Sequence, residues 1–298
     1  MNGPLTLRDP SSALTATFVP AAGMIGTSLA DDGVELLGQR RGLDAYVTSG
    51  KTMGIPLLYP WANRLSATTY EVDGTAVSLT VGTDGVRADE HGAPIHGVLA
   101  AYPGWVVAAA SANTVAAELD WGGDPRLLAS FPFPHILTQQ ITLADRTLAI
   151  ETTVTPTSGA RVPLCFGYHP YFAIPDVPRA DWELTAPPMR RLPVDGRGIP
   201  TGETQRWAGT AGPLGDVTYD DGFDEVPEGA VFILAGGGRR IEVTFEKGYP
   251  AAQLFAPPGE DLVAIEPMAA PTDALVRGNY RCATTDEPAT TRFSIKVL

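Results

Sequence analysis

Short runs in which apolar and polar residues alternate recur along the chain, and this pattern predicts β-strands. Alternation with a period of two places successive side chains on opposite faces of a sheet, so that one face packs against a core. Several runs are rich in Thr, Val, Ile and Phe, the residues that strands favour. The predicted strands cover residues 14–19, 76–81, 136–143, 147–154, 231–234, 241–245 and 293–298.

Glycine and proline residues punctuate the whole chain and argue against long helices. No window much longer than about ten residues keeps apolar residues at helical spacing without a Pro or Gly inside it. Many strands, frequent turn signals and no break in composition predict a large all-β sandwich in which residues 1–298 form a single domain. The predicted turns are Asp73-Gly74, Asp84-Gly85, Asp195-Gly196, Gly236-Gly237-Gly238 and Pro257-Pro258-Gly259.

The composition excludes several classes of partner. The formal net charge is −13 and the 21 Lys and Arg residues are scattered, which argues against nucleic acid and against an anionic membrane surface. No apolar run reaches the roughly 18 residues of a membrane span, and the N-terminal residues lack the pattern of a secretory signal. Cys165 and Cys282 are too few for a disulfide framework and have no metal-ligand spacing. We therefore expect a cytoplasmic protein. The expected assembly, a monomer or a homodimer, does not follow from the composition.

A histidine follows an apolar run of the chain. Residues 162–166 predict a buried strand, which ends at Gly167, His169 and Pro170. Pro170 favours an extended backbone at His169, so a titratable ring is expected at the rim of the core. The residues alone leave two interpretations open. His169 is either a core histidine whose ring nitrogens are satisfied by neighbours, or part of a pocket.

A proline-rich run presents an arginine in apolar surroundings. Pro56 and Pro60 are poorly compatible with a central strand, so residues 54–65 are expected at a sheet edge or in a loop across the sandwich. Asn63 and Arg64 end this run. An arginine emerging from apolar residues must be paired with an acid or face a ligand, because burying it alone is very costly.

Two more histidines lie on a loop rich in Gly and Pro, at residues 88–98. Loops held on a rigid scaffold often carry binding residues, and His96 lies between Ile95 and Gly97. His91 is surrounded by charged residues and is expected in solvent. His135 begins a predicted strand and is expected to be structural.

Carboxylates stand out at two further places. Glu266 follows an apolar run and precedes a proline, as His169 does, and is expected at the end of a strand. A carboxyl group at the rim of an apolar core has a raised pKa unless cations or hydrogen bonds compensate, which makes Glu266 a candidate general base, although a structural salt bridge remains possible. Asp220 and Asp221 precede Gly222, a pattern typical of a surface turn.

At these residues the chain resembles the aldose 1-epimerase, or mutarotase, family. The motifs occur in the family's order, and His-Pro-Tyr-Phe and Glu-Pro are the more specific of them. The resemblance implies a galactose mutarotase-like β-supersandwich with one sugar pocket and neither a metal nor an organic cofactor. The motifs that carry it are Asn63-Arg64, Ile95-His96-Gly97, Gly167 to Phe172, Asp220 with Phe223, and Ile265-Glu266-Pro267.

The resemblance also implies catalytic roles. Glu266 would take the proton from the anomeric hydroxyl and His169 would protonate the ring oxygen, while His96 would assist at the ring oxygen or anomeric centre. A carboxylate and an imidazole suit this task, since one proton must leave the sugar as another arrives. The protein would therefore be an isomerase that opens and closes the sugar ring.

The substrate-binding residues implied by the resemblance are Arg64 and Asp220, which would hold sugar hydroxyls, together with Asn63 and Tyr171. The neighbouring Asp221 leaves the binding carboxylate uncertain by one position, and the family pattern favours Asp220. Aromatic rings could also offer flat faces to a sugar, although core packing is the commoner role of Trp61, Tyr168, Phe172 and Phe223.

The leading interpretation is a mutarotase that interconverts the α and β anomers of a free aldose, with a monosaccharide as its partner. A hexose-6-phosphate 1-epimerase, or an epimerase-like enzyme for a modified sugar or glycoside, is an alternative that needs basic side chains at the pocket mouth. A non-catalytic carbohydrate-binding module and a glycosidase using Glu266 and Asp220 also remain open. The arginines available for a phosphate are Arg87, Arg161, Arg190, Arg191 and Arg277.

Overall fold

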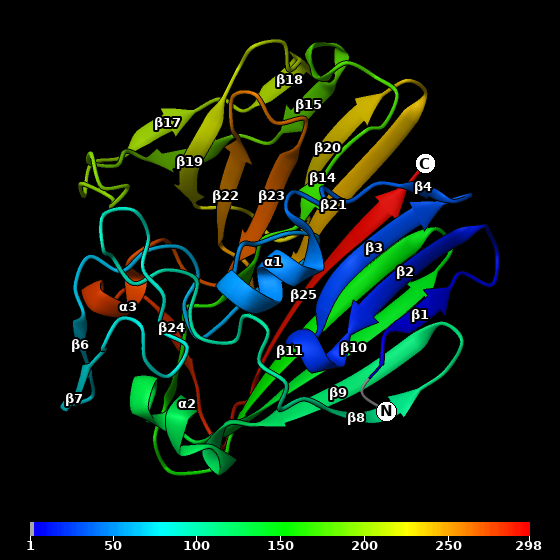
Figure 1. Ribbon diagram of the computed structural model, residues 1–298. Helices are drawn as coiled ribbons and strands as arrows, with labels where there is room; N and C mark the ends of the chain where they lie inside the picture. Colours follow the sequence, from blue (N-terminus) through cyan, green and yellow to red (C-terminus); the bar gives the residue numbers. More distant parts are fainter. Residues whose placement is uncertain (1–2) are drawn as a thin grey trace.

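The computed structural model describes residues 3–298, and its largest layer is a nine-stranded antiparallel sheet. In Figure 1 this sheet runs from β18 at the top to β8 at the bottom. The long strands lie in its centre, where both neighbours are paired over most of their length. In spatial order the strands are β18 (Thr210–Pro213), β15 (Glu183–Ala186), β20 (Ala230–Gly236), β21 (Arg239–Lys247), β25 (Ala289–Val297), β11 (Thr147–Pro156), β10 (His135–Ala144), β9 (Thr114–Asp120) and β8 (Val106–Ala110).

A second antiparallel sheet carries most of the motifs. Its central strands β22 and β23 are joined in register, and its far end is the two-residue strand β5. In spatial order the strands are β17 (Gln205–Trp207), β16 (Met189–Leu192), β19 (Tyr219–Asp224), β22 (Ala251–Ala256), β23 (Val263–Met268), β13 (Gly167–Tyr168) and β5 (Leu57–Leu58), with β14 (Tyr171–Phe172) also paired to β23.

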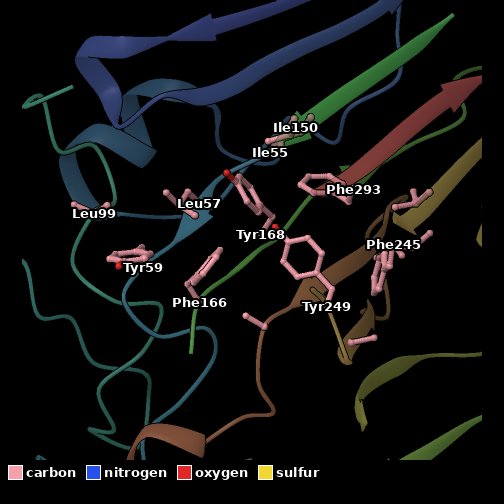
Figure 2. Close-up of a cluster of buried hydrophobic side chains, with 14 of the residues drawn as sticks. Ile55, Leu57, Tyr59, Leu99, Ile150, Phe166, Tyr168, Phe245, Tyr249 and Phe293 are labelled. Carbon is pink, nitrogen blue, oxygen red and sulfur yellow. The ribbon is translucent and has the colours of Figure 1, made fainter. Parts of the chain in front are cut away.

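Aromatic side chains fill the space between the two sheets, as Figure 2 shows. Tyr168 of β13 and Phe293 of β25 have ring centroids 5.0 Å apart, and Tyr249 lies 5.9 Å from Phe293. These rings belong to one connected cluster of buried residues, whose members range along the sequence from Leu7 to Val297. The structure therefore confirms the predicted all-β, single-domain sandwich.

Smaller elements surround the two sheets (Figure 1). A four-stranded sheet comprises β1 (Leu5–Arg8), β2 (Leu14–Val19), β3 (Ile25–Asp31) and β4 (Val34–Glu35). Two strand pairs are formed by β6 (Thr69–Val72) with β7 (Thr75–Ser78), and by β12 (Val162–Leu164) with β24 (Arg281–Ala283). The helices are α1 (Gly42–Ser49), α2 (Pro125–Ser130) and α3 (Ala274–Arg277), with single 3-10 turns at Pro20–Ala22, Trp121–Gly123 and Arg179–Asp181.

Period-two alternation located the strands well, because each predicted run overlaps an observed strand. The weakest prediction was 76–81, since β7 ends at Ser78. The turn between β6 and β7 is formed by Asp73 and Gly74, whose φ angles of +50° and +82° are both positive, as a tight two-residue hairpin turn that matches the right-handed twist of the strands requires. The expectation that long helices are absent is confirmed for residues 3–298, where the longest helix has 8 residues.

The chain around His169 is more broken than the sequence predicts. The apolar run 162–166 is not one strand, because β12 pairs with β24 and ends at Leu164, after which the chain crosses to the second sheet. Gly167 permits that crossing, since a Cβ there would lie 2.7 Å from the Pro267 carbonyl oxygen. His169 lies with Pro170 in the gap between β13 and β14.

Glu266 lies within β23 and does not end it, which corrects the prediction. The strand continues through Pro267 to Met268. The N–H of Ile265 donates to the Pro170 carbonyl at 3.3 Å. The backbone nitrogen of Pro267, two residues later in the strand, faces the same neighbouring chain. The neighbouring chain is interrupted there between β13 and β14, so that the missing N–H of the proline is tolerated inside a central strand.

The predicted surface turn at Asp220 and Asp221 is also wrong, because both residues belong to β19. Each carboxylate has a partner on an adjacent strand. Asp220 accepts a hydrogen bond from Gln253 at 2.8 Å, and Asp221 accepts one from Arg191 at 2.9 Å. Cross-strand partners of this kind stabilise an extended conformation that the local sequence disfavours.

Candidate active site

A pocket of about 300 Å³ opens on the face of the second sheet that points away from the core. This volume lies at the lower end of the range of small-molecule sites. Its wall combines β22 and β23, the gap around His169, residues 87–96 and the end of α1. All seven residues that the sequence proposed for a sugar site line it: Asn63, Arg64, His96, His169, Tyr171, Asp220 and Glu266.

An imidazole and a carboxyl group meet in this pocket. His169 Nε2 lies 3.2 Å from Glu266 Oε1, and the two side chains are 7% and 2% exposed. Neither His169 Nδ1 nor Glu266 Oε2 has a hydrogen-bond partner among the described residues. Both groups therefore keep a free polar atom for a ligand.

Tyr168 fixes the direction in which His169 points. The Tyr168 side chain enters the core, where its hydroxyl accepts from Gln139 Nε2 at 2.7 Å and lies 2.6 Å from Thr152 Oγ1. Successive residues of an extended chain point to opposite sides. His169 is consequently directed away from the core and into the pocket.

Burial shifts the pKa values of the pair in opposite directions. It raises the pKa of Glu266 well above the usual range, an effect that Asp220 reinforces and Arg64 opposes. It lowers the pKa of His169 well below the usual range, with His96 and Arg40 acting in the same direction. Both shifts favour uncharged forms. A neutral carboxyl beside a neutral imidazole holds as many protons as a carboxylate beside an imidazolium, so one proton moving between the pair interconverts them.

Tyr171 joins this pair to the pocket rim. Its hydroxyl lies 3.1 Å from His169 Nε2 and 2.6 Å from Thr52 Oγ1, and it accepts from Arg40 at 3.1 Å. Its ring stacks on the imidazole, with centroids 4.2 Å apart. Arg40 is held in turn by both oxygens of Glu260, at 2.8 and 2.9 Å.

Arg64 is paired with an acid and also lines the pocket, so it combines the two alternatives that the sequence left open, an ion pair and a place facing a ligand. Its Nε donates to Asp89 Oδ2 at 2.7 Å, and a second guanidinium nitrogen donates to Asn63 Oδ1 at 3.3 Å. Although burial alone would raise it, the pKa of Asp89 is held below the usual range by Arg64 and two backbone N–H groups. The carboxylate thereby fixes the guanidinium at the pocket wall.

His96 occupies a strained position beside the pair. Its φ is +61°, in the left-handed region that non-glycine residues seldom adopt, and its ring centroid lies 5.6 Å from that of His169. Burial lowers the pKa of His96 to about 3, with Arg64 and Arg87 contributing. His96 is therefore neutral at physiological pH, and its Nδ1 has no partner within residues 3–298.

The strand conformation of β19 resolves which aspartate faces the pocket. Asp220 lines it, whereas Asp221 points to the opposite side. Burial raises the pKa of Asp220 even though part of the side chain is exposed at the pocket mouth. Gln253, which donates to Asp220, is the register partner of Glu266 and so connects the two carboxyl groups.

Several pocket residues were not predicted from the sequence: Arg40, Thr52, Asp89, Gln253 and Phe255. The polar Gln253 inside the apolar strand β22 was the one visible clue. The Phe255 ring lines the pocket, 5.9 Å from that of His169. The four aromatics considered from the sequence are core residues, all at most 2% exposed: Trp61, Tyr168, Phe172 and Phe223.

The remaining histidines and arginines lie as follows. His91 is exposed and His135 is buried with a 2.6 Å hydrogen bond to the Tyr59 hydroxyl, as predicted. Of the five arginines considered for a phosphate, Arg87 alone lines the pocket.

Within residues 3–298, no three His, Cys, Asp or Glu side chains gather in a way that could hold a metal ion. No helix in the same range is long and apolar enough to cross a membrane.

The two large sheets and the outward-facing pocket define a galactose mutarotase-like β-sandwich protein. Residues 5–291 match the aldose 1-epimerase family, and the chain belongs to that family. The predicted resemblance is thus confirmed. No curated protein matches the chain significantly.

Solved structures with this fold come from several organisms. A Synechocystis protein is 21% identical, with a TM-score of 0.80 over 100% of this chain and 96% of its own. A galactose mutarotase-like protein from Clostridium acetobutylicum is 17% identical, with a TM-score of 0.80 over 96% and 92%. The GalM/aldose epimerase homologue from C. elegans is 17% identical, with a TM-score of 0.80 over 100% and 99%. At these identities the likeness establishes the fold.

Proposed function

We propose that this protein is an aldose 1-epimerase, an isomerase that interconverts the α and β anomers of a monosaccharide. The observation that carries the proposal is the buried contact of 3.2 Å between His169 Nε2 and Glu266 Oε1 in the pocket. A proton donor and a proton acceptor side by side suit a reaction in which one proton leaves the sugar as another arrives.

Glu266 acts as the base and His169 as the acid. The Glu266 carboxylate takes the proton of the anomeric hydroxyl, the C1–O1 bond becomes a carbonyl, and the bond between C1 and the ring oxygen breaks as His169 protonates that oxygen. Rotation about C1–C2 then presents the other face of the aldehyde. Reversal of both proton transfers closes the ring as the opposite anomer and restores the pair.

The shared proton explains how a base with a raised pKa serves this reaction. One transfer from Glu266 to His169 creates the carboxylate and imidazolium that the chemistry requires, without uptake of a proton from solvent. Arg64 favours the carboxylate, since it lowers the pKa of Glu266. Sugar hydroxyls donating to the free Oε2 would favour it further.

The other pocket residues hold the sugar. Arg64, Asn63 and Asp220 offer hydrogen bonds to its hydroxyls, and the neutral His96 bonds near the ring oxygen without competing for the proton of His169. Tyr171 contacts the sugar and supports the His169 ring through its 3.1 Å contact. No step requires a metal or an organic cofactor. A cytoplasmic location and a monomeric or homodimeric state remain predictions.

Polarimetry of freshly dissolved α-glucose and α-galactose tests the proposal. Each catalytic proton transfer contributes on the order of 10²–10⁴-fold in rate, so Glu266→Gln and His169→Asn should both reduce mutarotation close to the spontaneous rate. Arg161→Gln is the matched control, because Arg161 pairs with Asp73 outside the pocket. Undiminished catalysis in both pocket variants would contradict the assigned roles.

A further inference from the structure

One wall of the pocket carries positive charge that no acid neutralises. Arg41, Lys51 and Arg87 line the pocket, and none has a carboxylate oxygen within 4.0 Å among residues 3–298. The other two pocket arginines differ, since Arg40 pairs with Glu260 and Arg64 with Asp89. Arg41 and Lys51 are exposed to solvent, whereas Arg87 is half-buried, so Arg87 is the unpaired cation that needs an explanation.

Arg87 is the most constrained of these cations. Among residues 3–298 its guanidinium makes one hydrogen bond, donated to the Ala100 carbonyl at 3.2 Å, which leaves most of its N–H groups free. The guanidinium rests on the backbone of Gly50, where a Cβ would lie 2.1 Å from it. Gly50 ends α1 with a φ of +66°, so any other residue there would be strained and would displace the arginine.

A buried hydroxyl lies at the same wall. Tyr46 of α1 lines the pocket with 0% of its surface exposed, and its hydroxyl has no hydrogen-bond acceptor among residues 3–298. Burial raises the pKa of Tyr46 to about 12, while the Ala101 backbone and the charge of Arg87 act in the opposite direction. Tyr46 therefore offers a neutral O–H donor beside the Arg87 guanidinium, whose charge also acts on it. A buried donor without a partner is costly unless a ligand satisfies it.

The position of this wall relative to the catalytic pair indicates which part of the sugar it meets. The Arg87 carbonyl accepts from the N–H of Ile95, so Arg87 and His96 lie on adjacent segments. Gly50 is two residues from Thr52, which contacts Tyr171, and two residues of chain span at most about 7 Å. A sugar whose ring oxygen lies at His169 and His96 can direct towards this wall its exocyclic group, which branches from the ring carbon bonded to that oxygen.

We propose that Arg87, Tyr46 and Lys51 form a subsite for an anionic group, a phosphate or a carboxylate, carried by the exocyclic carbon of the sugar, with Arg41 at its edge. Guanidinium and ammonium groups with free N–H donors bind such oxyanions, and a phenol adds a neutral hydrogen bond. The inference rests on the proposed epimerase function for the orientation of the sugar. It predicts that the pocket prefers anionic monosaccharides to neutral ones.

Two measurements test the subsite: calorimetry measures binding, and polarimetry of the wild type measures turnover. Calorimetry with the Glu266→Gln variant compares glucose 6-phosphate, glucuronate and glucose, so that binding is read without catalysis. Charge-assisted hydrogen bonds of this kind correspond to roughly tenfold or more in affinity, and the better anionic sugar should bind tighter than glucose by that factor. Adding Arg87→Gln should reduce the preference about tenfold, and Tyr46→Phe by a smaller factor. Arg161→Gln, outside the pocket, should leave it unchanged.

The outcomes separate the subsite from the epimerase function. If an anionic sugar binds more tightly in an Arg87-dependent manner but no sugar is epimerised, the subsite stands and the proposed function fails. If the wild type epimerises glucose but the Glu266→Gln variant binds neither anionic sugar more tightly than glucose, the subsite is wrong and the function stands. Equal losses for all three sugars in Arg87→Gln would also overturn the subsite. The better of the two anionic sugars distinguishes a phosphate from a carboxylate.

Discussion

Glu266→Gln should make the fold more stable at neutral pH while it removes activity. The wild-type carboxyl is 2% exposed and its Oε2 has no partner among the described residues, so the folded state disfavours its ionised form. In the unfolded chain the same group ionises above pH 4–5. Since the pKa of Glu266 is raised in the folded state, its contribution to stability is full at acid pH and is lost as the pH rises. A glutamine keeps an oxygen for His169 and carries no proton to lose.

The magnitude follows from proton linkage. Between the unfolded and folded pKa values, the wild type loses about 1.4 kcal/mol of unfolding free energy per pH unit relative to the variant. In a chain of this size about 1 kcal/mol corresponds to roughly 2 °C in Tm, so the difference in Tm should widen by about 3 °C per pH unit above pH 5. Titration of His169 occurs in both proteins and largely cancels in the difference.

Thermal unfolding of both proteins by circular dichroism, at several pH values between 5 and 8, measures this difference directly. The expected result is a pair of Tm values that lie close together at acid pH and separate progressively towards neutral pH, with the variant higher. A difference that does not change with pH would refute the reasoning, because it would mean that Glu266 ionises as readily in the folded protein as in the unfolded chain.

Two further predictions concern catalysis. Because burial raises the pKa of Glu266 and lowers that of His169, the pair holds its one transferable proton over a wide range, and kcat/KM should form a plateau through neutral pH; a single fall centred near pH 6.5 would indicate an ordinary histidine instead. Tyr171→Phe removes one of the two polar neighbours of His169 Nε2 and should lower kcat roughly tenfold. A rise in KM with unchanged kcat would assign Tyr171 to substrate contact alone.

Much of the fold could be predicted because strand alternation is a local property. Tyr168 and His169 illustrate this, since adjacent positions of an extended chain point to opposite sides and one of them must meet the core. The break around Pro170 was visible as well. That the strand containing Glu266 continues through Pro267 was not, because it depends on a gap in the neighbouring strand that the local sequence does not reveal.

The pocket was predictable where its residues form motifs and unpredictable where they come together only through pairing. Gln253 reaches Asp220 because β22 lies between β19 and β23, and that order of strands cannot be read from residues 251–256. Arg40 directly precedes α1, and Arg87 lies on the loop that packs against the end of α1. The helix itself is too short to give a helical pattern in the sequence. The expected turn at Asp220 failed for the same reason, since distant partners decide its conformation.

Exchange NMR of an aldose at anomeric equilibrium tests the central claim most directly. With wild-type protein, cross peaks between the α and β anomeric protons should exceed those of a protein-free sample, with no new product signals, and Glu266→Gln should abolish the excess. Glucose, galactose, glucose 6-phosphate and glucuronate should be included, since the account does not depend on one sugar. No excess exchange with any of them, or an excess that persists in Glu266→Gln, would contradict acid–base epimerisation by the Glu266–His169 pair.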